Sequence, residues 1–126
     1  MQEKTINYKH TNTFSTSNEY TSKTKNVWFV LHGMGYLSKY FIKYFEDLNP
    51  LENYIIAPQA HSKYYQDKKY KYIGASWLTR EQIDLELENV YRYLDQVWED
   101  QATLWQDQNV FYKTTLLLEW FFRLKN

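Results

Sequence analysis

The chain has 126 residues, enough for one small domain, and its 15 basic and 15 acidic residues give a formal net charge of zero. This balance does not favour an anionic membrane or nucleic acid, so we expect no nucleic-acid partner. The absence of cysteine from the sequence excludes disulfides, thiolate metal sites and cysteine nucleophiles.

The hydropathy of the chain predicts a cytoplasmic protein without a membrane span. Residues 1–18 are polar and contain no apolar stretch typical of a signal peptide. The longest apolar runs, Val27–Leu31 and Leu116–Leu118, are far shorter than the ~20 residues that cross a bilayer. We expect neither a metal nor a cofactor, because the histidines lack the spacing of metal ligands: His10, His32 and His61.

Aromatic residues make up 20% of the chain, including 13 Tyr and 5 Trp. One interpretation is a stacking platform for sugars or bases. The other is a chain that uses Tyr freely, with tyrosines at the boundary of core and surface. We favour the second, because the tyrosines are scattered along the sequence.

The first elements in chain order are an extended arm and a buried strand. Residues 3–14 alternate weakly between apolar and polar types, which suits an edge strand or an arm, and residues 15–25 form a polar loop. Residues 27–31 are β-branched and aromatic without interruption, which is typical of a strand buried on both faces. This strand ends at residues 32–35, whose sequence is His-Gly-Met-Gly.

A helix and a second strand follow this loop. Ser38 is expected to cap a helix that runs to about Leu48 and ends before Pro50. Residues 54–57 then form a short buried strand that Pro58 closes. Strand, helix and strand in this order predict a βαβ unit with parallel strands.

The middle of the chain contains the clearest helical pattern. Residues 61–72 are polar and predict a surface loop, and residues 74–77 predict a turn. A helix over 79–100 follows, in which Thr79 and Gln82 fit a capping box. Apolar residues at helical spacing predict a face packed on a sheet: Ile83, Leu87, Val90, Tyr91, Leu94, Val97 and Trp98.

The order of these segments resembles the N-terminal half of an α/β-hydrolase of the carboxylesterase/phospholipase type, a family of small esterases. The likeness covers residues 27–100. It rests on the loop at 32–35, on Ala-Pro-Gln-Ala at 57–60 and on Gly-Ala-Ser-Trp-Leu-Thr-Arg-Glu at 74–81. The resemblance implies a partial α/β-hydrolase fold, with a parallel sheet covered by helices and an incomplete C-terminal half. It also implies a serine hydrolase whose partner is a small-molecule ester substrate.

Three residues near the loop take roles from the resemblance. The backbone N–H of Met34 would be one donor of the oxyanion hole, and Gly33 would let the backbone approach the developing negative charge. Trp77 could line an acyl pocket, and the alternative that we favour is a buried packing tryptophan. His32 is expected to be a hydrogen-bonded structural residue of the loop, and the other two histidines are expected to be solvated.

The rest of the sequence lacks the family's catalytic residues. The nucleophile should lie in Gly-x-Ser-x-Gly shortly after the long helix, yet residues 101–110 contain neither Ser nor Gly. No Ser follows Ser76 and no His follows His61, so no catalytic triad is assigned. We therefore predict that residues 1–100 are the N-terminal half of a hydrolase-like domain. Residues 101–126 are predicted to be a tail unlike the family, the product of a frameshift or a truncated gene.

Three functions follow from this sequence. The first is an enzyme by descent, an esterase that is inactive by itself because it lacks a nucleophile. The second is a non-enzymatic aromatic binding or interaction module, formed by tyrosines at 64, 65, 70 and 72 with four lysines nearby. The third is a remnant without activity, unstable unless an open sheet edge pairs with a second copy.

Overall fold

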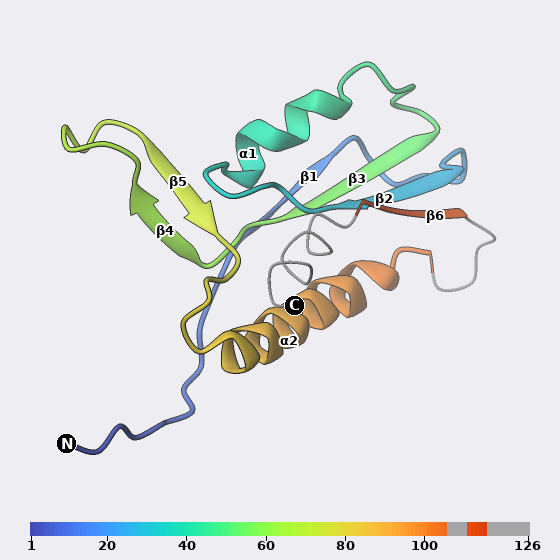
Figure 1. Ribbon diagram of the computed structural model, residues 1–126. Coiled ribbons are helices and arrows are strands. Elements are labelled where there is room, and N and C mark those ends of the chain that lie inside the picture. Colours follow the sequence, from blue (N-terminus) through green and yellow to red (C-terminus); the bar gives the residue numbers. More distant parts are fainter. Residues whose placement is uncertain (106–110, 116–126) are drawn as a thin grey trace.

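The computed structural model describes residues 1–105 and 111–115 and has an α/β architecture with two sheets (Figure 1). The larger sheet contains, in spatial order, β1 (Phe14–Ser17), β3 (Asn53–Pro58), β2 (Asn26–Val30) and β6 (Phe111–Thr115). Strand β2 is parallel to both of its neighbours, whereas β1 is antiparallel to β3. The sheet is therefore mixed, and the prediction of a parallel sheet was wrong at β1.

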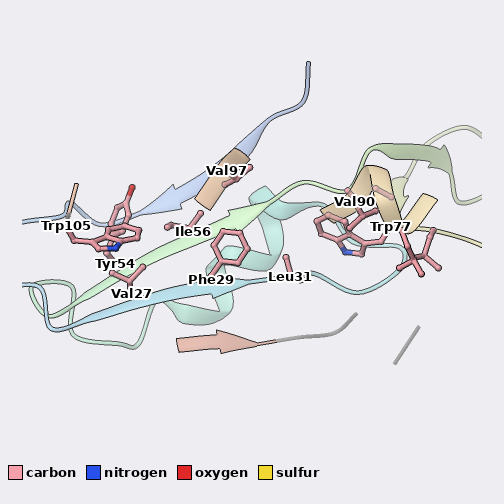
Figure 2. Close-up of a cluster of buried hydrophobic side chains, with 13 residues drawn as sticks. Val27, Phe29, Leu31, Tyr54, Ile56, Trp77, Val90, Val97 and Trp105 are labelled. Carbon is pink, nitrogen blue, oxygen red and sulfur yellow. The ribbon is translucent and has the colours of Figure 1, made fainter. Parts of the chain in front are cut away.

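Helices pack on both faces of this sheet. Successive residues of a strand point to opposite faces, so each buried strand places apolar side chains against both layers of helices. One face packs against α2 (Ile83–Ala102). The other face packs against α1 (Ser38–Phe41) and the 3-10 helix η1 (Ile42–Phe45) (Figure 1). Buried residues on the α2 face include Val27, Phe29, Leu31, Tyr54, Ile56, Leu87, Val90 and Val97 (Figure 2). Buried residues on the other face are Val30, Ile42, Ile55 and Ala57.

The predicted βαβ unit is present as β2, α1 with η1, and β3, but its helix begins differently from the prediction. Ser38 lies inside the first turn, where its Oγ is 3.1 Å from Ser15 Oγ. The N–H of Ser38 donates to Oε1 of Gln59 at 2.9 Å. A side chain from the end of β3 therefore satisfies the helix terminus, and the prediction that Ser38 is the cap was wrong.

The segment predicted as a surface loop and a turn is a β-hairpin. Strand β4 (Ser62–Tyr65) pairs with β5 (Ile73–Ser76) in an antiparallel two-stranded sheet that projects from the main sheet (Figure 1). All four residues of β4 are exposed. The strand was missed because a strand without a buried face carries no apolar alternation.

Helix α2 begins at Ile83, four residues later than predicted. Thr79 Oγ1 accepts a hydrogen bond from the N–H of Glu81, and Gln82 adopts the left-handed conformation with φ of 56°. The predicted capping box was therefore wrong, because a left-handed residue interrupts the helix at that point. The predicted apolar face is present at Leu87, Val90 and Val97, whereas Tyr91 is exposed.

Some residues beyond position 100 belong to the folded core. The side chain of Trp105 is buried, and its ring contacts those of Trp98 and Tyr20 at centroid distances of 5.5 and 5.9 Å. The family boundary at residue 100 stays a prediction, and the apolar run Leu116–Leu118 lies outside the described residues. Within residues 1–105 and 111–115, no helix has the length and apolarity needed to cross a membrane.

Candidate functional site

The His-Gly-Met-Gly loop, residues 32–35, lies at the carboxyl end of β2, where the order of the strands reverses. From β2 the chain passes through α1 to β3 on one side, and from β3 it passes through α2 to β6 on the other side. In α/β sheets, ligands bind outside the carboxyl ends of the strands at such a reversal. The loop therefore occupies the position at which this architecture forms binding sites.

His32 is held inside the fold by hydrogen bonds to both ring nitrogens. Nδ1 donates to the carbonyl oxygen of Gly33 at 2.8 Å, and Nε2 accepts from the N–H of Ala60 at 2.9 Å. These bonds require the neutral ring with its proton on Nδ1. Burial lowers the pKa of His32, against the smaller opposing effect of the Gly33 hydrogen bond. The predicted structural role of His32 is confirmed, because both nitrogens are occupied by backbone groups.

Trp77 connects the end of the hairpin to the base of the loop. Its side chain is fully buried in the α2-side core, where Figure 2 draws it close to Val90. Its Nε1 donates to the carbonyl oxygen of His32 at 2.7 Å, and its ring lies 5.1 Å from the His32 ring. These contacts agree with the packing role that we favoured. A contribution of Trp77 to an acyl pocket stays a prediction.

Residues 33–36 form a tight turn that presents the backbone of Met34. The N–H of Tyr36 donates to the carbonyl oxygen of Gly33 at 3.2 Å, and Gly35 has φ of 88° at the third position, where a type II turn favours glycine. Among the described residues, the N–H of Met34 forms no hydrogen bond. The turn thus leaves one backbone donor beside an exposed side chain. The oxyanion roles of Met34 and Gly33 stay predictions.

The β4–β5 hairpin is fixed directly to this turn. The N–H of Gly35 donates to the carbonyl oxygen of Ala75 at 3.0 Å. The N–H of Ala75 donates to the carbonyl oxygen of Tyr36 at 3.1 Å. The Gln66 side chain donates to the carbonyl oxygen of Gly35 at 2.6 Å. A Cβ at Gly74 would lie 2.6 Å from that same oxygen, so only glycine permits this approach. This junction was not predicted from the sequence, in which Gly74 was the one available signal.

A separate pocket of about 270 Å³ lies between the N-terminal arm and α2. His61 lines it, with Nε2 3.1 Å from Glu86 Oε2 and a partly buried side chain, so the prediction of a solvated His61 was wrong. Exposed His10 also lines the pocket, but no group of three or more metal-ligating side chains gathers within the described residues. The remaining lining carries no Ser, Thr or Cys that could attack an ester: Tyr8, Asn12, Asn89, Arg92, Tyr93 and Gln96.

Comparison with protein-family models, with curated proteins and with solved structures finds no match to this chain. The α/β class and the mixed sheet therefore rest on the structure itself.

Proposed function

We propose that this chain is the N-terminal half of an α/β-hydrolase of the carboxylesterase type and supplies one oxyanion donor, the N–H of Met34. The observation that carries the proposal is the position of the turn at residues 33–36, at the carboxyl end of β2 and at the reversal of strand order. In α/β-hydrolases, one oxyanion N–H comes from a loop that follows a strand at this end of the sheet.

The chemistry of such a site depends on a donor that is fixed before the reaction. When a nucleophile attacks an ester carbonyl, negative charge develops on the carbonyl oxygen, and a fixed N–H stabilises it without reorganisation. The turn that Gly33 and Tyr36 close, and the hairpin contacts of Gly35, hold the Met34 N–H in this way. One donor of this kind contributes roughly 3 kcal/mol to the lowering of the barrier.

The nucleophile is the part of the site that these 126 residues do not contain. The strand that follows α2 is β6 (Phe111–Thr115), and neither it nor the sequence around it contains Gly-x-Ser-x-Gly. We therefore propose that this chain alone performs no serine-dependent hydrolysis. A fluorophosphonate probe, which labels activated serines, is expected to leave the purified chain unlabelled. Labelling of any of its serines would contradict this part of the proposal.

The oxyanion role can be tested without a nucleophile. Methylphosphonate, a small tetrahedral anion, resembles the charged intermediate of ester hydrolysis. In a nitrogen-15 NMR titration of the full chain, we expect the Met34 amide to shift more than the amides of α2. An unchanged Met34 amide at saturating anion would contradict the proposed role.

The predicted frameshift has its own test in the encoding DNA. We expect one of the other two reading frames downstream of codon 100 to encode a Gly-x-Ser-x-Gly segment. If no frame encodes that segment, the frameshift hypothesis fails. The role of the Met34 amide is independent of this result.

A second candidate function, a non-enzymatic aromatic binding module, is favoured by the surface of the hairpin. The side chains of Tyr64, Tyr65, Tyr70 and Tyr72 are all exposed, and the Tyr65 and Tyr70 rings meet edge to face at 5.1 Å. Arrays of glycans and of single-stranded nucleic acids discriminate this function from the first. Failure to bind any of these ligands at millimolar concentration would exclude it.

A further inference from the structure

The pocket between the N-terminal arm and α2 lies where the arm passes from one attachment point to the next. Near the start of the arm, the Gln82 side chain donates to Oε1 of Glu3 at 2.6 Å. At the other end, Nδ2 of Asn12 donates to the carbonyl oxygen of Gln59 at 2.7 Å. Residues 4–11, between these points, form no hydrogen bond within the described chain. The arm therefore bridges across α2 and leaves a pocket of about 270 Å³ beside the helix.

Tyr93 fixes the inner wall of this pocket. Its hydroxyl donates to the carbonyl oxygen of Thr13 at 2.6 Å and accepts from the N–H of Gln59 at 3.1 Å. Burial raises the pKa of Tyr93 to about 12, so the hydroxyl keeps its proton and its donor role at neutral pH. These bonds join α2, the arm and the end of β3 before any ligand binds, and a wall that is already in place loses little entropy on binding.

The lining side chains come from two facing segments with regular spacing. Residues at intervals of three or four share one face of a helix, and one wall is such a face of α2: Glu86, Asn89, Tyr93 and Gln96. The other wall is formed by every second residue of the arm: Tyr8, His10 and Asn12. The fold thus brings two distant parts of the sequence to one cavity.

The α2 wall offers hydrogen-bonding groups that the fold does not use. The carboxamides of Asn89 and Gln96 form no hydrogen bond within the described residues. Glu86 Oε2 lies 3.1 Å from His61 Nε2, whereas Glu86 Oε1 has no partner in that part of the chain. A carboxamide both donates and accepts, and so does a ligand hydroxyl. The wall is therefore suited to a ligand with several neighbouring hydroxyl groups.

The charges of the lining favour an uncharged ligand. With neutral histidines, the pocket carries one carboxylate, that of Glu86, and one guanidinium, that of Arg92. The guanidinium of Arg92 already binds the carboxylate of Glu88 one helical turn away. The two formal charges of the lining cancel, so neither an anion nor a cation is attracted by an excess of the opposite sign.

The rings of the arm favour a sugar over a flat base. The Tyr8 and His10 rings have centroids 6.3 Å apart and planes inclined by 42°. They do not form the parallel pair that would clamp a flat base between them. The exposed Tyr8 ring instead presents an apolar face, on which the C–H groups of a sugar ring can pack.

We infer that this pocket binds a single uncharged pyranose sugar. Asn89, Gln96 and Glu86 form hydrogen bonds with its hydroxyl groups, and the Tyr8 ring covers its C–H face. Small-molecule pockets have volumes of roughly 300–1,000 Å³, and this pocket of about 270 Å³ lies just below that range, which suits one ring rather than an oligomer. The inference is independent of the oxyanion role proposed for Met34.

The test is a nitrogen-15 NMR titration of the full chain with glucose, galactose and mannose, each as the free sugar and as its methyl pyranoside. The side-chain NH₂ signals of Asn89 and Gln96 report on the pocket directly. Those of Asn49, which does not line it, are the internal reference. We expect at least one sugar to shift the two reporter signals with a dissociation constant of about 1 mM, the strength that a ligand of this size reaches. Binding of a methyl pyranoside would identify the end of a glycan as the source, and binding of a free sugar alone would identify a monosaccharide.

Three substitutions test the assigned contacts. Asn89→Ala and Gln96→Ala should each weaken binding of that sugar about fivefold, as loss of a hydrogen bond would. Tyr8→Ala should weaken it by a similar factor, because the packing face is lost. All three side chains are exposed, so the fold should be retained, and the dispersion of the amide spectrum checks this. The matched control is Asp95→Ala, at an exposed position of α2 outside the pocket, which should bind like the parent chain.

Three results would overturn the inference. The first is no shift of the Asn89 and Gln96 signals by any of these sugars at concentrations far above the expected dissociation constant. The second is a shift caused by adenosine or by inorganic phosphate and by no sugar, which would assign a base or an anion to the pocket. The third is unchanged sugar affinity in both Asn89→Ala and Gln96→Ala, which would place the sugar elsewhere on the molecule.

Discussion

Strands β3 and β4 follow one another in the chain, yet every residue of β3 is buried and every residue of β4 is exposed. Strand β3 is mainly apolar and β4 is polar, and tyrosine, which both contain, allows a direct comparison of their surroundings. Tyr54 of β3 is 6% exposed, because its strand lies between β1 and β2 and packs on α2. Tyr64 of β4 has only β5 as a strand partner within the described residues. The comparison separates a strand that the core surrounds from a strand that lies in solvent with one strand partner in the described part of the chain.

The largest effect is expected for a truncation in β3. Ile56→Ala removes a fully buried side chain from the α2-side core, and such cavities reduce the free energy of unfolding by about 2–5 kcal/mol. Urea denaturation followed by circular dichroism measures this loss. A loss below about 1 kcal/mol would indicate that β3 is not the stabilising strand.

The junction between the two regions should be nearly as sensitive. In Gly74→Ala, the new Cβ would clash with the backbone of Gly35, and overpacking of this kind is worth about 1–3 kcal/mol. We expect faster hydrogen exchange at the amides of Gly35 and Ala75, with exchange in α2 unchanged. Ile73→Ala, at an exposed position of the same strand, is the control that should leave these amides protected.

The buried histidine of the loop predicts a dependence of stability on pH. Its folded pKa lies below the ordinary value of 6.5, so the unfolded chain binds more protons once the pH falls below about 6.5. The free energy of unfolding should therefore be fully retained above this pH. Below it, the stability should decrease by up to about 1.4 kcal/mol per pH unit until the folded pKa is reached.

His32→Gln supplies the comparison for this prediction. Glutamine has no proton to gain in this range, so the stability of the variant should change less steeply between pH of about 5 and 7. Urea midpoints across the range measure both slopes. Identical slopes in the two proteins would exclude His32 as the titrating group.

The smallest effect is expected on the exposed strand. Tyr65→Ala removes a ring that contacts Tyr70 and pairs with Ile73, and exposed cross-strand contacts contribute about 0.2–1 kcal/mol. The same urea titration should therefore give a midpoint close to that of the parent chain. A loss as large as that of Ile56→Ala would remove the distinction between the two strands.

The elements that could be predicted from the sequence are those whose burial leaves a local pattern. The continuous apolar run predicted β2, a similar run predicted β3, and residues at helical spacing such as Leu87 and Val90 predicted α2. The polar strand β4 gave no such signal, because neither of its faces joins the core. The short strand β1 was likewise assigned mostly to a loop.

The candidate site, like the fold, was predicted from the sequence only in part. The motif at residues 32–35 and the structural role of His32 followed from the sequence and from the family resemblance. Two contacts of the structure were not predicted. One joins Gln66 to Gly35, and the other is the partly buried pair of His61 with Glu86. Each joins residues far apart in the chain, and no single segment carries a pattern for such a pair.

The sequence by itself determined two buried strands, the long helix and the glycine-bearing turn, because apolar periodicity and the need for glycine at positive φ act over a few neighbouring residues. Only the tertiary structure decided that Gln59 caps α1, that β1 runs antiparallel and that the hairpin lies against Gly35. These features depend on hydrogen-bond partners that the fold brings together from distant segments, and a buried backbone group accepts whichever partner the fold provides.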